Sequence, residues 1–320
     1  MKIFDVIIVG SGPIGITCGI EAKKRNLSHL IIDKGCLVNS LFHYPTNMTF
    51  FSTSDRLEIG DVPFVSHGDK PTRRESLEYY RRVTDLWQLD VNTYENVNEI
   101  VNKDELFIVQ TSKNKYSAKN IIAATGFFDH ANMLNVPGED LPKVKHYFTE
   151  AHPYAYLNVA VIGGGNSAVD VALETFRRRS KVTMIVREPT LKESVKYWVK
   201  PDIENRIKEG SIKAWFNSEV KEIRTDEIDV QSPNGVIIIK NDFVFAMTGY
   251  HPDYSFLRKI GVNVSEDKLQ IPQFDPDTFE SNIKALYLAG VVCGGMETNK
   301  WFIENSRDHA EKIFNHIQKL

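Results

Sequence analysis

The chain has 320 residues, of which 42% are hydrophobic and 25% are charged, and its formal net charge is −3 at pH 7. This composition is that of a globular protein with room for two domains of ordinary size. It gives no electrostatic basis for binding nucleic acid or an anionic membrane, and no apolar run reaches the ~18 residues that span a bilayer. We therefore expect a cytoplasmic protein that binds neither nucleic acid nor membranes.

The first predicted element is a short buried strand that runs into a glycine-rich turn. Residues 6–9 are an apolar run with the length of a parallel strand. A helix is expected over 16–24, and a second strand over 28–32 ends at Asp33. The glycines between the first strand and the helix have G-x-G-x-x-G spacing, at Gly10, Gly12 and Gly15. Strand, glycine turn, helix and acidic strand end together indicate a dinucleotide site.

Each residue of this pattern has a physical task. Gly10 allows the chain to turn tightly, Gly12 lets the backbone approach a pyrophosphate, and Gly15 lets the helix pack closely on the strand. The pyrophosphate would lie on the free N–H groups at the helix N-terminus. Asp33 would accept hydrogen bonds from a ribose. An ordinary glycine-rich turn is the alternative interpretation.

The segment that follows Asp33 is less regular. Residues 35–64 are polar, aromatic and rich in turn residues, which makes a long loop for one without function. Residues 73–88 predict a helix, and residues 91–126 predict short strands. The last of these strands is apolar and ends at Thr125-Gly126, so we expect it to return the chain to the first sheet beside the ligand.

The same pattern returns in the second half of the chain. Gly163 and Gly165, followed by Ala168, repeat the strand, glycine turn and helix. The next strand ends at Arg187 instead of an acid, and an arginine there suits the 2′-phosphate that distinguishes NADPH from NADH. Lys192 would assist. A solvated surface arginine is the alternative for Arg187.

This order of elements predicts an α/β fold with two Rossmann-like dinucleotide-binding domains, one inserted into the other. The outer domain is discontinuous, with expected bounds 1–125 and 246–320, and the inserted domain is expected over 126–245. The chain would cross between the domains twice, near 118–150 and 243–250. Such crossings allow one domain to rotate on the other.

The two nested units, each with a returning strand that ends in Thr-Gly, resemble the thioredoxin-reductase-like flavoproteins over essentially the whole chain. Three longer strings are similar to the bacillithiol disulfide reductases: YPTNMTFFSTSDRLEIGDVPF, HYFTEAHPY and FAMTGYHPDYSFL. The resemblance implies FAD on the first loop and NADPH on the second. It also implies NADPH-driven reduction of bacillithiol disulfide or a related small disulfide, by a homodimer or homotetramer.

The resemblance also implies site residues. The residues placed on FAD are Gly10, Gly12, Pro13, Ile14, Gly15, Asp33, Lys34, Ser40, Asn47, Thr49, Thr125, Gly126, Gly290, Lys300 and Trp301, the last two at the expected start of the final helix. The residues placed on NADPH are Gly163, Gly165, Asn166, Ser167, Ala168, Arg187 and Lys192.

The chain departs from these families at its cysteines. Thioredoxin reductases have a C-x-x-C pair shortly before the second glycine loop, and this chain has none there. Bacillithiol reductases typically have a cysteine where this chain has Ile14. Three cysteines remain, at Cys18, Cys36 and Cys293, too few and too scattered for a disulfide framework or a metal site. Cys293 is the candidate redox thiol, because it is expected nearest the flavin, although a packing role is the alternative and the flavin could also pass electrons directly.

Two other functions stay open at this stage. One is a different reaction on the same fold, that of a flavin monooxygenase or a ferredoxin-NADP reductase. The F-x-G-x-x-x-H motif of the monooxygenases is absent from this sequence. The other is a flavin-binding redox sensor with low turnover, for which the loss of the family cysteine is the motive.

Overall fold

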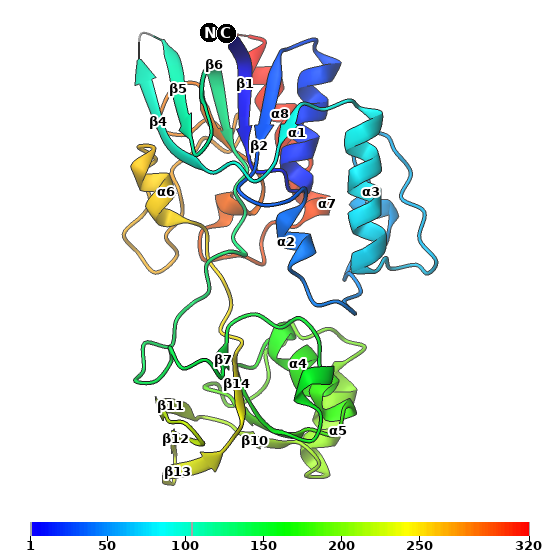
Figure 1. Cartoon of the computed structure of the whole chain (residues 1–320), viewed down its shortest axis with the longest axis vertical. Coiled ribbons are helices and arrows are strands. Elements are labelled where there is room, and N and C mark those ends of the chain that lie inside the picture. Colours follow the sequence, from blue (N-terminus) through cyan, green and yellow to red (C-terminus); the bar gives the residue numbers. More distant parts are fainter. Residues whose placement is uncertain (1, 104, 320) are drawn as a thin grey trace. The chain divides into compact units, whose positions relative to one another are not determined.

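The computed structural model describes residues 2–103 and 105–319 and divides the chain into two compact units (Figure 1). The first unit comprises Met1–His130 and Tyr250–Leu320, and the second comprises Ala131–Gly249. These junctions lie a few residues after the expected ones at 125/126 and 245/246.

The first unit is built on a seven-stranded sheet. Its strand order is β3-β2-β1-β6-β5-β4, and β15 pairs with the end of β6. The parallel strands are β1 (Ile3–Val9), β2 (His29–Ile32), β3 (Val91–Asn92), β6 (Lys115–Ala123) and β15 (Leu286–Leu288). The antiparallel strands are β4 (Val97–Lys103) and β5 (Leu106–Thr111). Residues 6–9 of β1 are all buried because both faces of the central sheet are covered.

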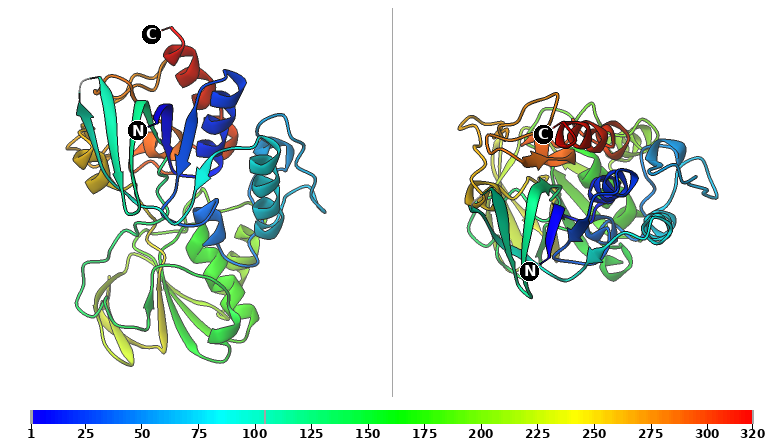
Figure 2. Two further views of the ribbon diagram at one scale, coloured as in Figure 1. Left: turned by 45° about the horizontal axis from the view of Figure 1, so that its top comes forward. Right: turned by 90° about the horizontal axis from the view of Figure 1, so that it is seen from above.

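Two helices far apart in sequence pack side by side on this sheet. They are α1 (Pro13–Lys24) and α8 (Asp308–Ile317), blue and red in Figure 2. Cys18 and Ala22 from α1 and Ile313 and Phe314 from α8 join the strand residues in one core. The C-terminal part of the first unit also contains the helices α6 (Tyr254–Lys259) and α7 (Ile303–Ser306). The short helix η3 (Gly290–Gly294) follows β15.

The long segment after β2 forms its own small core against α3 (Arg73–Leu86). Thr72 begins α3 with a capping box in which its side chain and that of Glu75 exchange hydrogen bonds with each other's backbone N–H. Tyr79 stacks on Phe64, with ring centroids 4.1 Å apart. The segment contains the short helices α2 (Asn39–Phe42) and η1 (Asp55–Leu57), so the loop predicted over 35–64 is ordered by side chains of its own.

The second unit has a five-stranded parallel sheet of order β10-β9-β8-β14-β7. Its strands are β7 (Val144–Lys145), β8 (Asn158–Ile162), β9 (Lys181–Ile185), β10 (Lys213–Trp215) and β14 (Phe243–Ala246). Val159 and Val161 of β8 face the helices α4 (Asn166–Arg177) and α5 (Lys200–Lys208). Ala160 and Ile162 face a meander of β11 (Glu219–Ile223), β12 (Glu227–Ser232) and β13 (Gly235–Lys240).

Among the helices that the structure describes, none has the length and apolar character needed to cross a bilayer.

Candidate functional site

The first glycine loop, residues 10–15, connects β1 to α1 and leaves one position open. Gly10 has φ +110°, and a Cβ there would overlap the carbonyl oxygen of Ala124, the residue after β6. A Cβ on Gly15 would overlap the carbonyl oxygen of Gly10. A Cβ on Gly12 would meet nothing within 4 Å. The loop is therefore closed on its protein side at two positions and open at Gly12, where a ligand can approach the backbone at the start of α1.

Asp33, which follows β2, holds this loop in place through hydrogen bonds. Its Oδ2 accepts hydrogen bonds from the backbone N–H and the hydroxyl of Ser11, at 2.6 and 2.9 Å, and its Oδ1 accepts one from Gly35 N at 2.8 Å. A carboxylate has about four lone-pair positions, so Oδ1 keeps capacity for one more donor. Asp33 can thus accept a ribose hydroxyl, but its first task is structural, and Ser11 is a loop residue that the spacing argument missed.

The returning strand β6 delivers a buried hydroxyl beside the same loop. Ala124 N donates to Val9 O at 2.8 Å, which places residues 124–126 at the carboxyl end of β1. The Oγ1 of Thr125 is buried and has no hydrogen-bond partner. Gly126 has φ +71° and open space where a side chain would lie. An unsatisfied buried hydroxyl is costly, and a polar ligand at this edge would satisfy it.

Other residues predicted for the first site are placed less simply. Lys34 pairs with Asp129 at 3.0 Å. Ser40 lies half-buried in α2, and Asn47 and Thr49 are exposed on the loop that follows. All four residues are at least partly accessible to a ligand, but Lys34 already has an anionic partner within the protein.

The prediction that Lys300 and Trp301 begin the final helix is wrong. Both residues precede α7, which starts at Ile303, and a separate helix α8 follows it. Arg307, between the two helices, donates to Glu58 O at 2.7 Å, so a long-range contact holds the chain where the helix is interrupted.

The three thiols do not form a redox-active arrangement. Cys18 and Cys293 are 0% and 2% exposed, and burial raises the pKa of each thiol well above its usual range. Cys36 is half-buried, and burial, followed by the charge of Asp33, raises its pKa. Ile14 packs on Gly290, whose Cβ would lie 3.3 Å from Ile14 Cγ1. A thiol that is buried and protonated is a poor nucleophile, so the structure speaks against Cys293 as an electron relay.

The second glycine loop, residues 163–168, repeats the geometry of the first. Gly163 has φ +125°, and a Cβ there would lie 2.5 Å from the carbonyl oxygen of Met247, the residue after β14. Ala168 is accommodated at the third position, with its Cβ 3.4 Å from the place of a Cβ on Gly163. At Gly165 the nearest group is the Lys192 side chain, whose Cδ lies 3.7 Å from the would-be Cβ. Lys192 therefore passes over the open position of the loop.

Asn166 connects the start of α4 to the segment that contains Lys192. Its Nδ2 donates to Ser194 O at 2.9 Å, and its Oδ1 accepts from Lys196 N at 2.8 Å. Lys192 N donates to Gly164 O at 2.9 Å. Asn166 thus ties residues 192–196 to the N-terminus of α4, which is why Lys192 reaches the loop. Ser167 is exposed on the first turn of the helix.

Arg187, two residues after β9, is 73% exposed and pairs only loosely with its neighbour Glu188, at 3.3 Å. A guanidinium this free can rotate toward an anion at modest cost. Arg187 and Lys192 are the exposed cations that follow β9 and border the loop, so both can reach a phosphate there.

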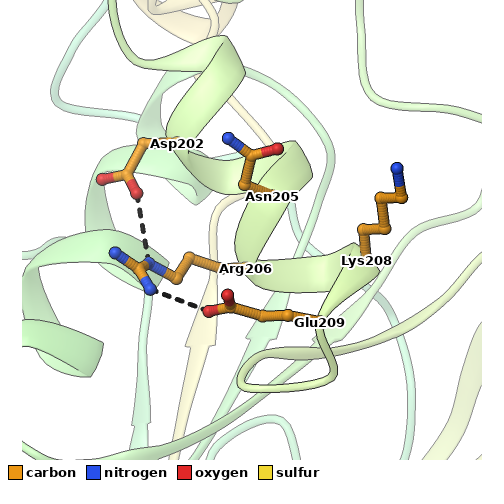
Figure 3. Close-up of a pocket in the computed structure, with 5 residues that line it drawn as sticks. All are labelled: Asp202, Asn205, Arg206, Lys208 and Glu209. Carbon is orange, nitrogen blue, oxygen red and sulfur yellow. Dashed lines mark hydrogen bonds and ion pairs between the residues drawn. The ribbon is translucent and has the colours of Figure 1, made fainter.

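A depression of about 510 Å³ lies on the second unit along α5 (Figure 3). Arg206 is held between Asp202 and Glu209, at 3.2 and 2.7 Å, and the depression is otherwise lined by Asn205 and Lys208. Because its central cation is already neutralised, this surface is not a candidate site. Among the described residues, no group of histidine, cysteine and acidic side chains could hold a metal ion.

Comparisons with known proteins identify the family and the fold of the chain. The family described as "Pyridine nucleotide-disulphide oxidoreductase" matches residues 7–290. The "Bacilliredoxin reductase Bdr" of Bacillus subtilis (strain 168) is 44% identical over 98% of this chain and 97% of its own length. The solved "Bacillithiol Disulfide Reductase Bdr (YpdA)" of Staphylococcus aureus is 40% identical, covers 100% of this chain and 99% of its own, and has a TM-score of 0.97. The thioredoxin reductase of T. acidophilum, 21% identical, covers 100% of this chain and 99% of its own with a TM-score of 0.79, which shows a shared fold.

Proposed function

Because the chain belongs to the pyridine nucleotide-disulphide oxidoreductases, and among them to the bacillithiol disulfide reductase family, we propose that it is an FAD-dependent enzyme that uses NADPH to reduce bacillithiol disulfide or a related low-molecular-weight disulfide. The overall reaction is balanced as NADPH, a proton and one disulfide giving NADP⁺ and two thiols.

The observation that carries this proposal is a pair of glycine loops with matching backbones and opposite charge at the following strand end. FAD would lie on the loop of the first unit, with its pyrophosphate at Gly12 and its ribose toward Asp33. The buried Thr125 hydroxyl, which has no hydrogen-bond partner in the protein, would gain one from the bound FAD. NADPH would lie on the second loop, with its 2′-phosphate toward Lys192 and Arg187.

The chemistry that FAD supplies when bound is acceptance of a hydride from NADPH and release of an electron pair to an acceptor. This chain's own residues would hold the two dinucleotides. Since the Cys18 and Cys293 side chains are buried, the proposal assigns no covalent step to a protein thiol. The disulfide would receive electrons without a mixed disulfide to the enzyme.

The test measures the two half-reactions one after the other: reduction of the flavin by NADPH, then its reoxidation by the disulfide. Purified protein is treated without oxygen with one equivalent of NADPH, bacillithiol disulfide is added, and the flavin absorbance is followed. We expect rapid bleaching, then recovery on addition of the disulfide, with two thiols formed for each NADPH. The double variant Cys18→Ser/Cys293→Ser is the matched control and should recover at the same rate.

Other outcomes separate the alternatives. Recovery only with oxygen, through a long-lived oxygen adduct, would indicate a monooxygenase. Recovery only with ferredoxin would indicate a ferredoxin-NADP reductase. Bleaching without recovery with any of these acceptors, but with a partner bound only in one redox state, would indicate a sensor.

A further inference from the structure

A buried histidine of the C-terminal helix contacts the turn next to the first glycine loop. His309 lies in α8, is 2% exposed, and accepts a hydrogen bond from Gly290 N through Nδ1 at 3.2 Å. Because Nδ1 is the acceptor, the ring proton is on Nε2. The Nε2 is itself buried and has no hydrogen-bond partner. The bond from Gly290 N is therefore the hydrogen bond that orients the imidazole ring of His309, since Nε2 makes none.

The surroundings keep this imidazole neutral. Phe279 stacks on one face, with centroids 3.9 Å apart, and Trp301 meets the ring edge-on at 4.5 Å. Burial, and then the nearby charge of Lys312, lowers the pKa of His309 to about 3. A second ammonium, that of Lys300, lies over the Trp301 ring at 5.8 Å. Near neutral pH, His309 is therefore a pure acceptor toward Gly290 and carries no charge.

The turn that His309 holds lies next to the proposed flavin site. Gly290 lies two residues after the end of β15 and begins η3 with φ +84°. A Cβ at Gly290 would lie 3.3–3.4 Å from three side-chain atoms of Ile14, in the first turn of α1, so the two residues are closely packed. The position of the 290–294 backbone is thus defined from two sides, by Ile14 of the glycine-loop helix and by His309 of α8.

We propose that His309 is a positioning residue, which fixes the Gly290 amide and thereby the 290–294 turn against the first glycine loop, so that the flavin environment depends on its Nδ1 acceptor. The inference rests on the proposed function, in which FAD occupies the first unit. The proposal gives His309 no role in proton transfer, because its Nδ1 already accepts from Gly290 N and its Nε2 is buried.

The test compares substitutions that differ in one acceptor. His309→Asn keeps an acceptor oxygen at the topological position of Nδ1, whereas His309→Gln places its oxygen one atom further along, and His309→Leu has none. The readouts are the visible absorption band of the bound flavin, its midpoint potential, and the affinity of the flavin-free protein for added FAD. We expect His309→Leu and His309→Gln to shift the band and the potential and to weaken FAD binding by about tenfold, as for the loss of one buried hydrogen bond. His309→Asn should restore wild-type values, and the KM for NADPH should not change.

A matched control exists on the same helix. His316 Nδ1 lies 3.1 Å from the hydroxyl of Tyr287 and so joins α8 to β15 without touching Gly290. His316→Leu should lower the melting temperature while leaving the flavin band and potential at wild-type values.

Three results would overturn the inference alone. They are a wild-type flavin band in His309→Leu and His309→Gln, a failure of His309→Asn to restore the band, or an equal shift in His316→Leu. If His309→Leu does not fold, the pair of His309→Asn and His309→Gln decides the question. Wild-type protein that neither contains nor binds FAD would overturn the proposed function, and this inference with it.

Discussion

The two glycine loops of this protein share a backbone and differ in what surrounds it. In each, the first glycine is closed by the carbonyl of the residue that follows a returning strand, Ala124 in one unit and Met247 in the other. The charged residues that follow β2 and β9 differ in their surroundings. Asp33 is buried and bonded three times, whereas Arg187 is exposed and loosely paired. In the proposed function, the shared part would hold the diphosphate of each dinucleotide, and the differing part would select which dinucleotide binds.

The third position of the loops shows how closely each helix approaches. At Gly15 there is no space for even a methyl group, because the carbonyl of Gly10 occupies it. At Ala168 a methyl group is present, 3.4 Å from the place that a Cβ on Gly163 would take. Helix α1 therefore sits closer to its loop than α4 does.

The largest expected effect is at this third position. Gly15→Ala should destabilise the first unit by about 3 kcal/mol or more, because the overlap is with backbone and cannot be relieved by a side-chain rotation. This reverses the usual gain of about 1 kcal/mol for Gly→Ala inside a helix. Urea unfolding measures it. Ala168→Gly is the control in the other loop and should cost about 1 kcal/mol or less; equal losses in the two variants would break the comparison.

The second effect is an acid sensitivity confined to the first unit. His309 has a folded pKa of about 3 and an ordinary value of 6.5, and burial also lowers the pKa of His29. As the pH falls below 6.5, the unfolded chain takes up protons that the folded chain refuses. The contribution of these neutral histidines to the free energy of unfolding is therefore complete above pH 6.5. It is lost progressively toward pH 3, by up to about 1.4 kcal/mol per pH unit for each proton.

Unfolding in urea at pH 7 and pH 5 checks this effect, with tryptophan fluorescence and proteolysis to distinguish the units. His309→Leu should flatten the pH dependence, and His316→Leu should not. A first unit that is equally stable at the two pH values would contradict the assignment of a neutral, buried His309.

The third effect tests the buried acid. Asp33→Asn should weaken FAD binding at least about tenfold and destabilise the first unit by about 2 kcal/mol, since an amide nitrogen cannot accept from Ser11. Titration of flavin-free protein with FAD measures the affinity. Asp61→Asn is a suitable control, because its side chain is 86% exposed. If NADPH binding falls as much as FAD binding, Asp33 does not act on the first loop alone.

The smallest effect sharpens the other side of the comparison. Lys192→Ala should raise the KM for NADPH about tenfold and leave that for NADH unchanged, because it removes one cation from the 2′-phosphate. Arg187→Ala should act in the same direction. Steady-state kinetics with both nucleotides check this, and Arg178→Ala, an exposed arginine at the end of α4, is the control. An unchanged preference in the double variant would remove the phosphate assignment.

Much of the architecture could be predicted because it is encoded locally. The glycine spacings, the apolar strands and the helix predicted over 73–88, which the structure has at Arg73–Leu86, follow from backbone conformation and periodicity within short windows. The insertion of one unit in the other follows from the order of those windows. The final helix was expected to begin at Lys300, whereas α7 begins at Ile303 and α8 follows it. Arg307, between the two helices, donates to the backbone of Glu58, far away in the sequence, and no local pattern predicts that contact.

The site was predictable only where a residue's task is its own backbone. By itself the sequence determined the two glycine loops, the acid and the arginine that follow them, and the family, since glycine geometry and strand ends depend on near neighbours. Only the tertiary structure decided that Asn166 ties down the segment carrying Lys192, that Ser11 uses much of Asp33, and that Cys293 is sealed. It also decided that His309 holds Gly290. These roles depend on which side chains folding brings together and excludes from water, and no local pattern encodes that.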